Sequence, residues 1–319
     1  MKTESLTFNR DDYRSLGKNI IQEEVGVRLD TYLAGKFLFH SRSAWIKVIR
    51  KKEVIVNSRV EKPSYRMRLN DRILYYSPQD CEPEVDFSVK KIWQQDDVLA
   101  TYKPSNLPMH EGGRYRKNTF CEVIKEKFIE DWAPVHRLDR ETSGIVLCAK
   151  TKESRAELSE LFVQQQIEKT YFAIVFGSPT EDSWWVNQPI VESCSDLIRT
   201  KQWVGDGGLP ARTHFRVKAR KPGFTLLEVS PKTGRTHQIR VHAACSGFPL
   251  VGDKKYCKDE SIFCEYMDYG FTRRVQEHCL VERLCLHAAK IVFPLPVSKE
   301  IKTIITRIPD DMQKIWGSL

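Results

Sequence analysis

The sequence lacks the features of several large protein classes. Its 319 residues contain no apolar run approaching the ~20 residues of a membrane span, and its first 13 residues are polar rather than signal-like. It has no Gly-rich phosphate loop, zinc-deaminase signature or Ser-His-Asp order, and no pattern that recurs with a period of 20–50 residues. We therefore expect a globular protein that stays in the cytosol.

Cysteine is present, but not in the spacing that zinc sites use. None of the nine cysteines forms a Cys-x-x-Cys pair. The C-terminal half has an irregular cluster in which histidines also occur: Cys245, Cys257, Cys264, Cys279, Cys285, His278 and His287. Such a cluster can in principle bind zinc, but reduced, partly buried thiols are the commoner arrangement. We expect no metal.

The charge is concentrated in one stretch. Hydrophobic residues make up 41% and charged residues 29% of the chain, which is long enough for one large domain and a small one. The net charge is +9, and residues 36–72, with eleven basic and three acidic side chains, account for +8 of it. A charge run is usually just a solvated surface. Here it coincides with a compact pattern of elements, which favours binding to a polyanion.

Residues 24–77 show that pattern. Apolar residues recur at helical spacing over 27–37, and Ser41 can cap a second helix with Trp45, Ile46 and Ile49 inward. Its outward cations include Arg42, Lys47, Arg50 and Lys51. Residues 54–57 and 72–76 are typical of strands. The stretch resembles the RNA-binding module named after ribosomal small-subunit protein four, in which the helix pair grips RNA phosphates.

This stretch departs from the module's pattern at its turns. The module's usual glycine before the first strand is Lys52 here, and its usual Asn-Gly turn is Asn57-Ser58. Because asparagine tolerates left-handed geometry, we expect Asn57 and Asn70 to carry the turns. Residues 78–88 are Pro-rich and acidic, which predicts a linker between this domain and a second one at 89–319. Residues 1–23 are predicted to be an extension.

The centre of the second domain is residues 136–144, His-Arg-Leu-Asp-Arg-Glu-Thr-Ser-Gly, followed by a short apolar run that predicts a buried strand. Asp139 lies between Arg137 and Arg140. These cations favour an ionised carboxylate, which suits a nucleophile better than a proton donor. By itself, an aspartate between arginines is more often a surface ion pair.

The complete motif resembles the catalytic signature of the RluA family of pseudouridine synthases, and every position of it is filled. The resemblance implies that Asp139 is the catalytic aspartate. It also implies that Arg137 can enter the gap left by a flipped base. In the family, a Lys-Pro pair before a small loop is a structural turn, which assigns Lys103 and Pro104 to the scaffold.

Three further segments extend the resemblance. A helix is predicted over 153–167, with Ala156 among its inward residues, and a strand over 169–177 in which Tyr171 matches the family's active-site tyrosine. In residues 234–242, Gly-Arg-Thr-His-Gln-Ile-Arg-Val-His, the resemblance makes Arg240 the partner of the catalytic aspartate, with Arg235 as the second candidate. Leu286 matches a leucine that packs beneath the target ring.

The resemblance implies an α+β fold. The catalytic domain would have a bent, largely antiparallel mixed sheet flanked by helices, beside a small N-terminal α/β RNA-binding domain. The implied activity is isomerisation of uridine to pseudouridine in structured RNA, without a cofactor. Large-subunit ribosomal RNA is favoured as substrate, transfer RNA is the alternative, and a non-catalytic RNA-binding or ribosome-assembly protein is the competing class. We expect a monomer with no membrane partner.

Overall fold

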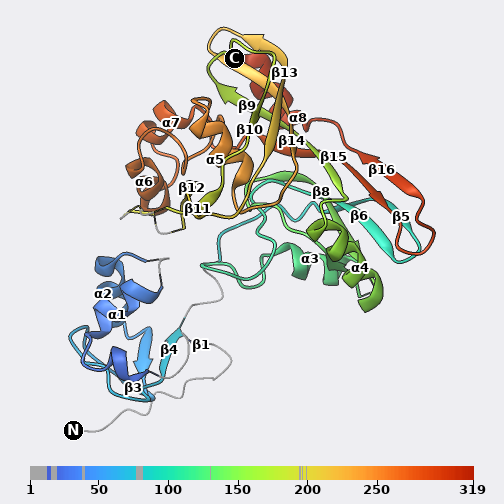
Figure 1. Ribbon diagram of the computed structural model, residues 1–319. Coiled ribbons are helices and arrows are strands. Elements are labelled where there is room, and N and C mark those ends of the chain that lie inside the picture. The colour runs from blue at the N-terminus through green and yellow to red at the C-terminus, as the bar shows by residue number, and fades with distance from the viewer. Residues whose placement is uncertain are drawn as a thin grey trace, which may run out of the picture. The chain divides into compact units, whose positions relative to one another are not determined.

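The structure is a computed structural model that describes residues 13–15, 20–37, 40–76, 82–129, 131–193, 195, 197–198 and 200–319 (Figure 1). The chain divides into two compact units, which are described separately: Met1–Pro83 with Gly112–Arg116, and Glu84–Glu111 with Lys117–Leu319. No helix within the described ranges is long and apolar enough to cross a membrane.

The first unit combines two helices with a small antiparallel sheet. Its elements are β1 (Tyr13–Ser15), the 3-10 turn η2 (Gln22–Glu24), α1 (Leu29–Lys36), α2 (Arg42–Arg50), β2 (Val54–Val56), β3 (Arg59–Val60) and β4 (Ile73–Tyr76). The strand order is β1-β4-β2-β3. The Ser41 hydroxyl caps α2 by accepting a hydrogen bond from the Ala44 amide at 3.3 Å. Trp45 and Ile49 are buried in the core, as predicted.

The turns of this unit adopt left-handed geometry at the predicted asparagines. Asn57 has a φ of 49° and Asn70 a φ of 64°. Lys52, which replaces the expected glycine, also has a positive φ of 65°. This conformation has a steric cost for a lysine that a glycine avoids, so the turn before β2 is left-handed even without a glycine.

Part of the predicted extension belongs to the first unit. Strand β1 pairs with β4, and Ile20 is buried in the unit's core, where its amide donates to the Asp71 carbonyl oxygen at 3.1 Å. Residues 1–12 and 16–19 of the extension, and 77–81 around the start of the predicted linker, lie outside the described residues. The domain boundaries themselves stay a prediction.

The second unit is organised around a ten-stranded sheet. Its strands and helices are β5 (Lys90–Gln95), β6 (Val98–Lys103), α3 (Phe120–Lys127), β7 (Ala133–Pro134), β8 (Ser143–Ala149), α4 (Lys152–Val163), β9 (Glu168–Phe176), β10 (Ser183–Val186), β11 (Ile190–Glu192), β12 (Gln202–Val204), β13 (Thr213–Lys221), β14 (Phe224–Pro231), α5 (Gln238–Cys245), α6 (Ser261–Tyr269), α7 (Arg273–Cys279), β15 (Leu286–Pro294), β16 (Ile301–Ile305) and α8 (Asp310–Ser318). The main strand order is β10-β13-β14-β9-β15-β8-β6-β5, with β16 on β15 and β7 on β8. Strands β11 and β12 form a separate hairpin.

Helices cover both faces of this sheet. Along β14, Leu227 and Val229 face the core beneath α5, whereas Leu226 faces the α8 residues Met312 and Trp316. Helices α3 and α4 lie beside β6 and β8, and α5, α6 and α7 lie together beside the β11–β12 hairpin (Figure 1). Among the described strands, all pairings in the large sheet are antiparallel except that of β8 with β15. The predicted α+β class is confirmed.

Helix α4 is shorter than the pattern predicts. It begins after the Thr151 cap, as expected, but ends at Val163 rather than at residue 167. Gln165 has a φ of 59°, which ends the helix and turns the chain into β9. Ile167 is buried at the end of this connection, directly before β9, so an apolar residue that seemed to continue the helical period belongs to the connection instead. Ala156, predicted to face inward, is exposed.

The glycine that ends the central motif, Gly144, allows the parallel contact between β8 and β15. Gly144 has a φ of 126°, and a Cβ atom there would lie 2.2 Å from the Ala288 carbonyl oxygen and 2.6 Å from the Ala288 nitrogen. Both colliding atoms belong to the backbone and cannot rotate away. The glycine therefore brings the loop that carries Asp139 directly against β15.

We expect Gly144→Ala to lower the free energy of unfolding by roughly 3 kcal/mol or more, because it adds a backbone collision to the strain of positive φ. Gly223→Ala is the matched control. Gly223 also has a positive φ, of 78°, but nothing lies within 4 Å of its Cβ position, so only about 1 kcal/mol of strain is expected. Urea unfolding of both variants measures the difference. Equal losses would contradict the collision.

Candidate active site

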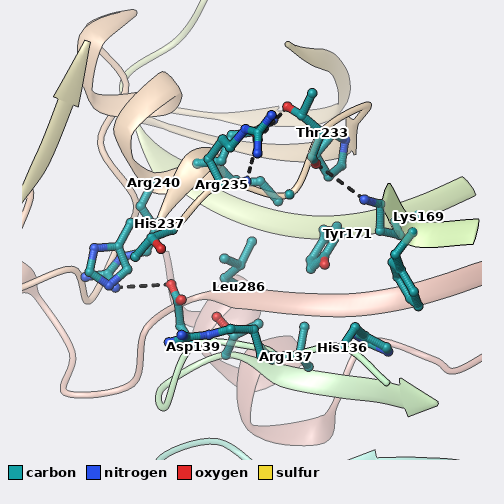
Figure 2. A pocket seen from close by; sticks show the side chains of 18 of the residues that line it. His136, Arg137, Asp139, Lys169, Tyr171, Thr233, Arg235, His237, Arg240 and Leu286 are labelled. Atoms are coloured by element: carbon teal, nitrogen blue, oxygen red, sulfur yellow. Dashed lines mark hydrogen bonds and ion pairs between the residues drawn. The ribbon is translucent and has the colours of Figure 1, made fainter. Parts of the chain in front are cut away.

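A cavity of about 540 Å³ opens over the middle of the large sheet (Figure 2). Its walls come from residues 135–139 before β8 and from residues 233–240, which form the turn after β14 and the start of α5. Strand β9 contributes Lys169 and Tyr171, and β15 contributes Leu286. Segments more than a hundred residues apart in sequence thus meet around one space, which has the size expected for a small-molecule or nucleotide site.

An ion-pair chain holds the aspartate of the central motif. Arg240 Nη1 donates to Asp139 Oδ2 at 3.3 Å. Its Nε and Nη2 donate to Asp253 at 2.7 and 2.8 Å, a bidentate pair. Asp253 also accepts from the backbone amides of Lys255 and Tyr256 at 3.0 and 3.1 Å. Asp253 therefore fixes the plane of the Arg240 guanidinium, whose remaining nitrogen, Nη1, donates to Asp139.

The electrostatics keep Asp139 ionised. Burial opposes its ionisation, but the neighbouring His237, Arg240 and Arg137 outweigh it, and the pKa of Asp139 is lower than its ordinary value. Burial and the Arg240 charge in turn lower the pKa of His237 to about 4, so His237 is neutral near pH 7. Arg240, which stays charged at every accessible pH, is the cation that holds Asp139 as a carboxylate.

Two side chains form the floor beside Asp139. Tyr171 and Leu286 come from the neighbouring strands β9 and β15 and lie between the Asp139 loop and the Arg235 turn (Figure 2). Leu286 is only 3% exposed and packs in the core below the cavity. Burial and the Asp139 carboxylate raise the pKa of Tyr171, so its phenol stays neutral. The floor thus offers an aromatic face and an apolar contact.

The two candidate arginines occupy different places. Arg240 contacts Asp139, whereas the Nε of Arg235 donates to the Pro210 carbonyl oxygen at 3.0 Å. The Arg235 amide donates to Gln238 Oε1 at 3.0 Å, which holds the turn against α5. Arg137 is exposed at the cavity wall. In the structure, Arg240 is therefore the candidate arginine that contacts Asp139, and its role in the reaction stays a prediction.

Comparisons with known proteins agree with this geometry. Residues 97–245 match a family model described as RNA pseudouridylate synthase, and residues 27–73 match the S4 domain. A protein from Vibrio vulnificus named ribosomal large subunit pseudouridine synthase C is 32% identical, with 94% of this chain and 95% of that protein covered. A protein of the same name from Escherichia coli O157:H7 is 30% identical at the same coverage. The chain belongs to the RNA pseudouridylate synthase family.

The resemblance seen in the sequence is thus confirmed, and the chain is an RNA pseudouridine synthase with an N-terminal S4 domain. Solved structures agree on the fold. A structure described as human RNA Pseudouridylate Synthase Domain Containing 4 superposes with a TM-score of 0.56 and 24% identity, covering 70% of this chain and 90% of that one.

Sequence reasoning missed the residues of the synthase that support Arg240. Asp253 lies in a segment, Gly252-Asp253-Lys254-Lys255-Tyr256, that resembles the family, but it was assigned no role, because its partner Arg240 lies 13 residues away. Tyr256 places its ring 5.0 Å from the Arg240 guanidinium, and its hydroxyl hydrogen bonds to His237 Nδ1 at 2.8 Å. His237 precedes α5 with a left-handed φ of 55°. Asp253, Tyr256 and His237 therefore surround Arg240 and position its guanidinium.

Lys103 holds the loop that carries Asp139 against the end of β6. It is fully buried, and its Nζ donates to the carbonyl oxygens of Pro104, Leu107 and Arg140 at 2.9, 2.8 and 3.0 Å. Burial lowers its pKa to about 7. The bond to Arg140 ties the residue next to Asp139 to the end of β6. These contacts support the prediction that Lys103 belongs to the scaffold.

The histidine of the motif also has a structural role. The Leu147 amide donates to His136 Nε2 at 2.9 Å, so this nitrogen carries no proton. Burial and the Lys169 charge lower the pKa of His136 to about 3. Its ring lies 4.6 Å from that of Phe162 on α4. His136 is therefore a neutral link between the loop, β8 and α4.

The remaining predicted RNA-binding residues belong to the S4 unit. Lys47, Arg50 and Lys51 are exposed on or just after α2. Arg42 is exposed but engaged, because its Nη2 donates to the buried Asp30 at 3.0 Å. Arg42 therefore has a structural partner within its own unit as well as a place on the predicted RNA-binding surface.

Proposed function

We propose that this synthase converts uridines to pseudouridine in large-subunit ribosomal RNA, with Asp139 as the catalytic residue. The observation that carries the proposal is the Asp139 carboxylate, held ionised by Arg240 at 3.3 Å in a cavity that admits a nucleoside. Two relatives that match nearly the whole chain bear the name of large-subunit ribosomal enzymes. Transfer RNA remains the alternative substrate.

The reaction breaks the C–N bond between uracil and ribose and forms a C–C bond from C5 of the same ring. No electron enters or leaves, so the exchange needs no redox cofactor. The base must first leave its stack, which costs least in looped RNA. Arg137, exposed at the cavity wall, fills the gap left by the base. Asp139 then acts on the ribose or the ring, or removes a ribose proton.

Other cavity residues hold the detached ring while it rotates. The neutral Tyr171 phenol stacks on the uracil and hydrogen bonds to it, and Leu286 packs beneath. Arg235 steers the RNA backbone at the opposite wall. A non-catalytic RNA-binding role is not favoured, because an ionised aspartate in the cavity repels RNA phosphates and does not contribute to binding a polyanion. We assign the grip to residues 24–77 and the chemistry to residues 89–319.

Mapping pseudouridines in cells with and without the gene tests the proposal. We expect loss of one or more sites in large-subunit ribosomal RNA, restored by the intact chain but not by Asp139→Asn. Sites that disappear only from transfer RNA would overturn the substrate assignment. An unchanged map would favour the non-catalytic alternative.

Replacing the outward cations of α2 separates anchoring from chemistry. The variant carries Lys47→Gln, Arg50→Gln and Lys51→Gln. If these residues bind phosphates, affinity for RNA falls, and the slope of log affinity against log salt becomes shallower by about 0.7–0.9 for each phosphate that is no longer neutralised. The rate at saturating RNA stays within about tenfold, because cations on phosphates position the RNA without entering the bond exchange.

The matched control removes three cations of the second unit that lie on or beside β16: Lys299, Lys302 and Arg307. This control should leave the salt slope close to that of the unaltered protein. An unchanged slope in the α2 variant would show that its cations form only a solvated surface.

A further inference from the structure

An exposed aromatic group lies outside the cavity, at the edge of the large sheet. Strand β10 is an edge strand that pairs with β13 (Figure 1). On it, Trp185 is 45% exposed, a large fraction for a tryptophan. The Arg212 guanidinium lies 4.1 Å from the centroid of its ring, and the His214 ring lies 4.7 Å away with an interplanar angle of 35°. The indole of Trp185, the guanidinium of Arg212 and the imidazole of His214 therefore lie together at this edge of the sheet.

Packing of the sheet does not account for Trp185. Its neighbour Trp184 points to the opposite face, where it stacks on Phe215 at 5.1 Å and joins the buried core. Trp185 pairs in register with His214 on the other face. Because Trp184 already covers the core at this position, Trp185 adds exposed apolar surface at a sheet edge, which soluble proteins usually avoid.

The group adjoins the rim of the active-site cavity. The Lys232 amide donates to the Arg212 carbonyl oxygen at 2.9 Å, and the Arg212 amide donates to the Thr233 hydroxyl at 3.1 Å. Thr233 lines the cavity. The exposed Arg212 is therefore bonded through its amide to a side chain of the cavity wall, and the exposed Lys232 is bonded through its amide to Arg212.

The charge around the group suits a phosphate backbone. Four exposed cations lie on β13 or at the ends of β13 and β14: Arg212, Arg216, Lys218 and Lys232. Glu228 accepts ion pairs from Arg216 and Lys218. Arg212 lies over the Trp185 ring and bonds to the rim residue Thr233, which Lys232 directly precedes. Burial and the Arg216 and Lys232 charges lower the pKa of His214, which favours a neutral ring suited to stacking.

We propose that Trp185, Arg212 and His214 form a stacking platform for an unpaired base of the RNA substrate, adjacent to the nucleotide that enters the cavity. The inference rests on the proposed function, since that function brings RNA to the rim. Single-stranded nucleic acids bind where cations follow the backbone and planar side chains receive the bases. A guanidinium stacked on an indole offers both in one unit. The platform would hold the strand beside the target uridine while that base is flipped out.

The test compares two labelled probes on the full chain: a ten-nucleotide oligouridine, and an abasic strand of equal length with the same phosphates. Trp185→Leu should weaken binding to oligouridine by about fivefold or more and leave the abasic strand unaffected. Trp185→Tyr, which restores an aromatic plane, should recover most of the affinity. Tyr269→Leu is the control, because Tyr269 is 78% exposed at the end of α6 and does not line the cavity.

A second substitution tests the platform in case the Trp185→Leu variant does not fold. Arg212→Lys keeps the charge and removes the guanidinium plane, so it should also weaken oligouridine binding while sparing the abasic strand. Equal losses on both probes, or no loss on either, would overturn the platform. Formation of pseudouridine in a large-subunit RNA transcript is measured in parallel. If the unaltered chain forms product but the substitutions cause no loss of affinity that depends on the bases, only the platform is refuted. If that loss is seen but the unaltered chain forms no product, the proposed function is refuted.

Discussion

Asp139→Asn is expected to abolish pseudouridine formation and to leave RNA binding largely intact. The substitution keeps the shape of the side chain and removes the charge that makes it a nucleophile or base. A loss of roughly 10⁴-fold or more in turnover would match the effect of removing the central group of a covalent catalyst. The measurement is single-turnover formation of pseudouridine by purified protein, with RNA affinity determined separately.

A matched control is Asp182→Asn. Asp182 is 87% exposed and pairs with Arg220 on the sheet, and its amide variant should retain full turnover. Turnover by purified Asp139→Asn, prepared from a host that lacks competing synthases, would refute the assignment of Asp139.

Arg240→Met is expected to damage both the fold and the chemistry. It leaves Asp253, which is fully buried, without its bidentate partner, and it removes the cation that holds Asp139. Breaking a buried ion pair from one side typically costs about 3–5 kcal/mol. We expect a loss of this size in the free energy of unfolding, together with a large loss of turnover. Arg235→Met is the control for the free energy of unfolding, because Arg235 bonds to a backbone carbonyl and not to Asp139.

The same variant should change the dependence of turnover on pH. In the unaltered enzyme the pKa of Asp139 lies below its ordinary value of 3.8, so its carboxylate persists as the pH falls until that lowered pKa is reached. Removing Arg240 removes an ion pair and a hydrogen bond that offset burial, so we expect the pKa of Asp139 to rise. The acid limb of the pH–rate profile should therefore move to higher pH. An unshifted limb, or greater damage from Arg235→Met, would show that Arg240 does not control Asp139.

Much of the chain could be read from the sequence because its signals are local. The Ser41 cap, the inward Trp45 and Ile49, and the buried strand after the central motif each depend on residues a few positions apart. Hydrophobic periodicity and capping act over that range, so the elements follow from it. The unbroken motif around Asp139 indicated the family, which the comparisons confirmed. The roles of its individual residues stay predictions.

The tertiary structure decided how these parts meet. Asp139 and Arg240 are separated by 101 positions in the sequence, and the motif left Arg235 as a second candidate. Only the fold turns Arg240 toward Asp139, because Asp253 orients its guanidinium and Gly144 lets the catalytic loop lie against β15. Lys103 was assigned to the scaffold by motif, but one of its three carbonyl partners, Arg140, lies 37 positions away in the Asp139 loop. Such contacts depend on the spatial closeness of distant segments, which sequence spacing does not encode. Local sequence therefore determined the elements and the chemistry, and packing between distant strands determined which charges meet.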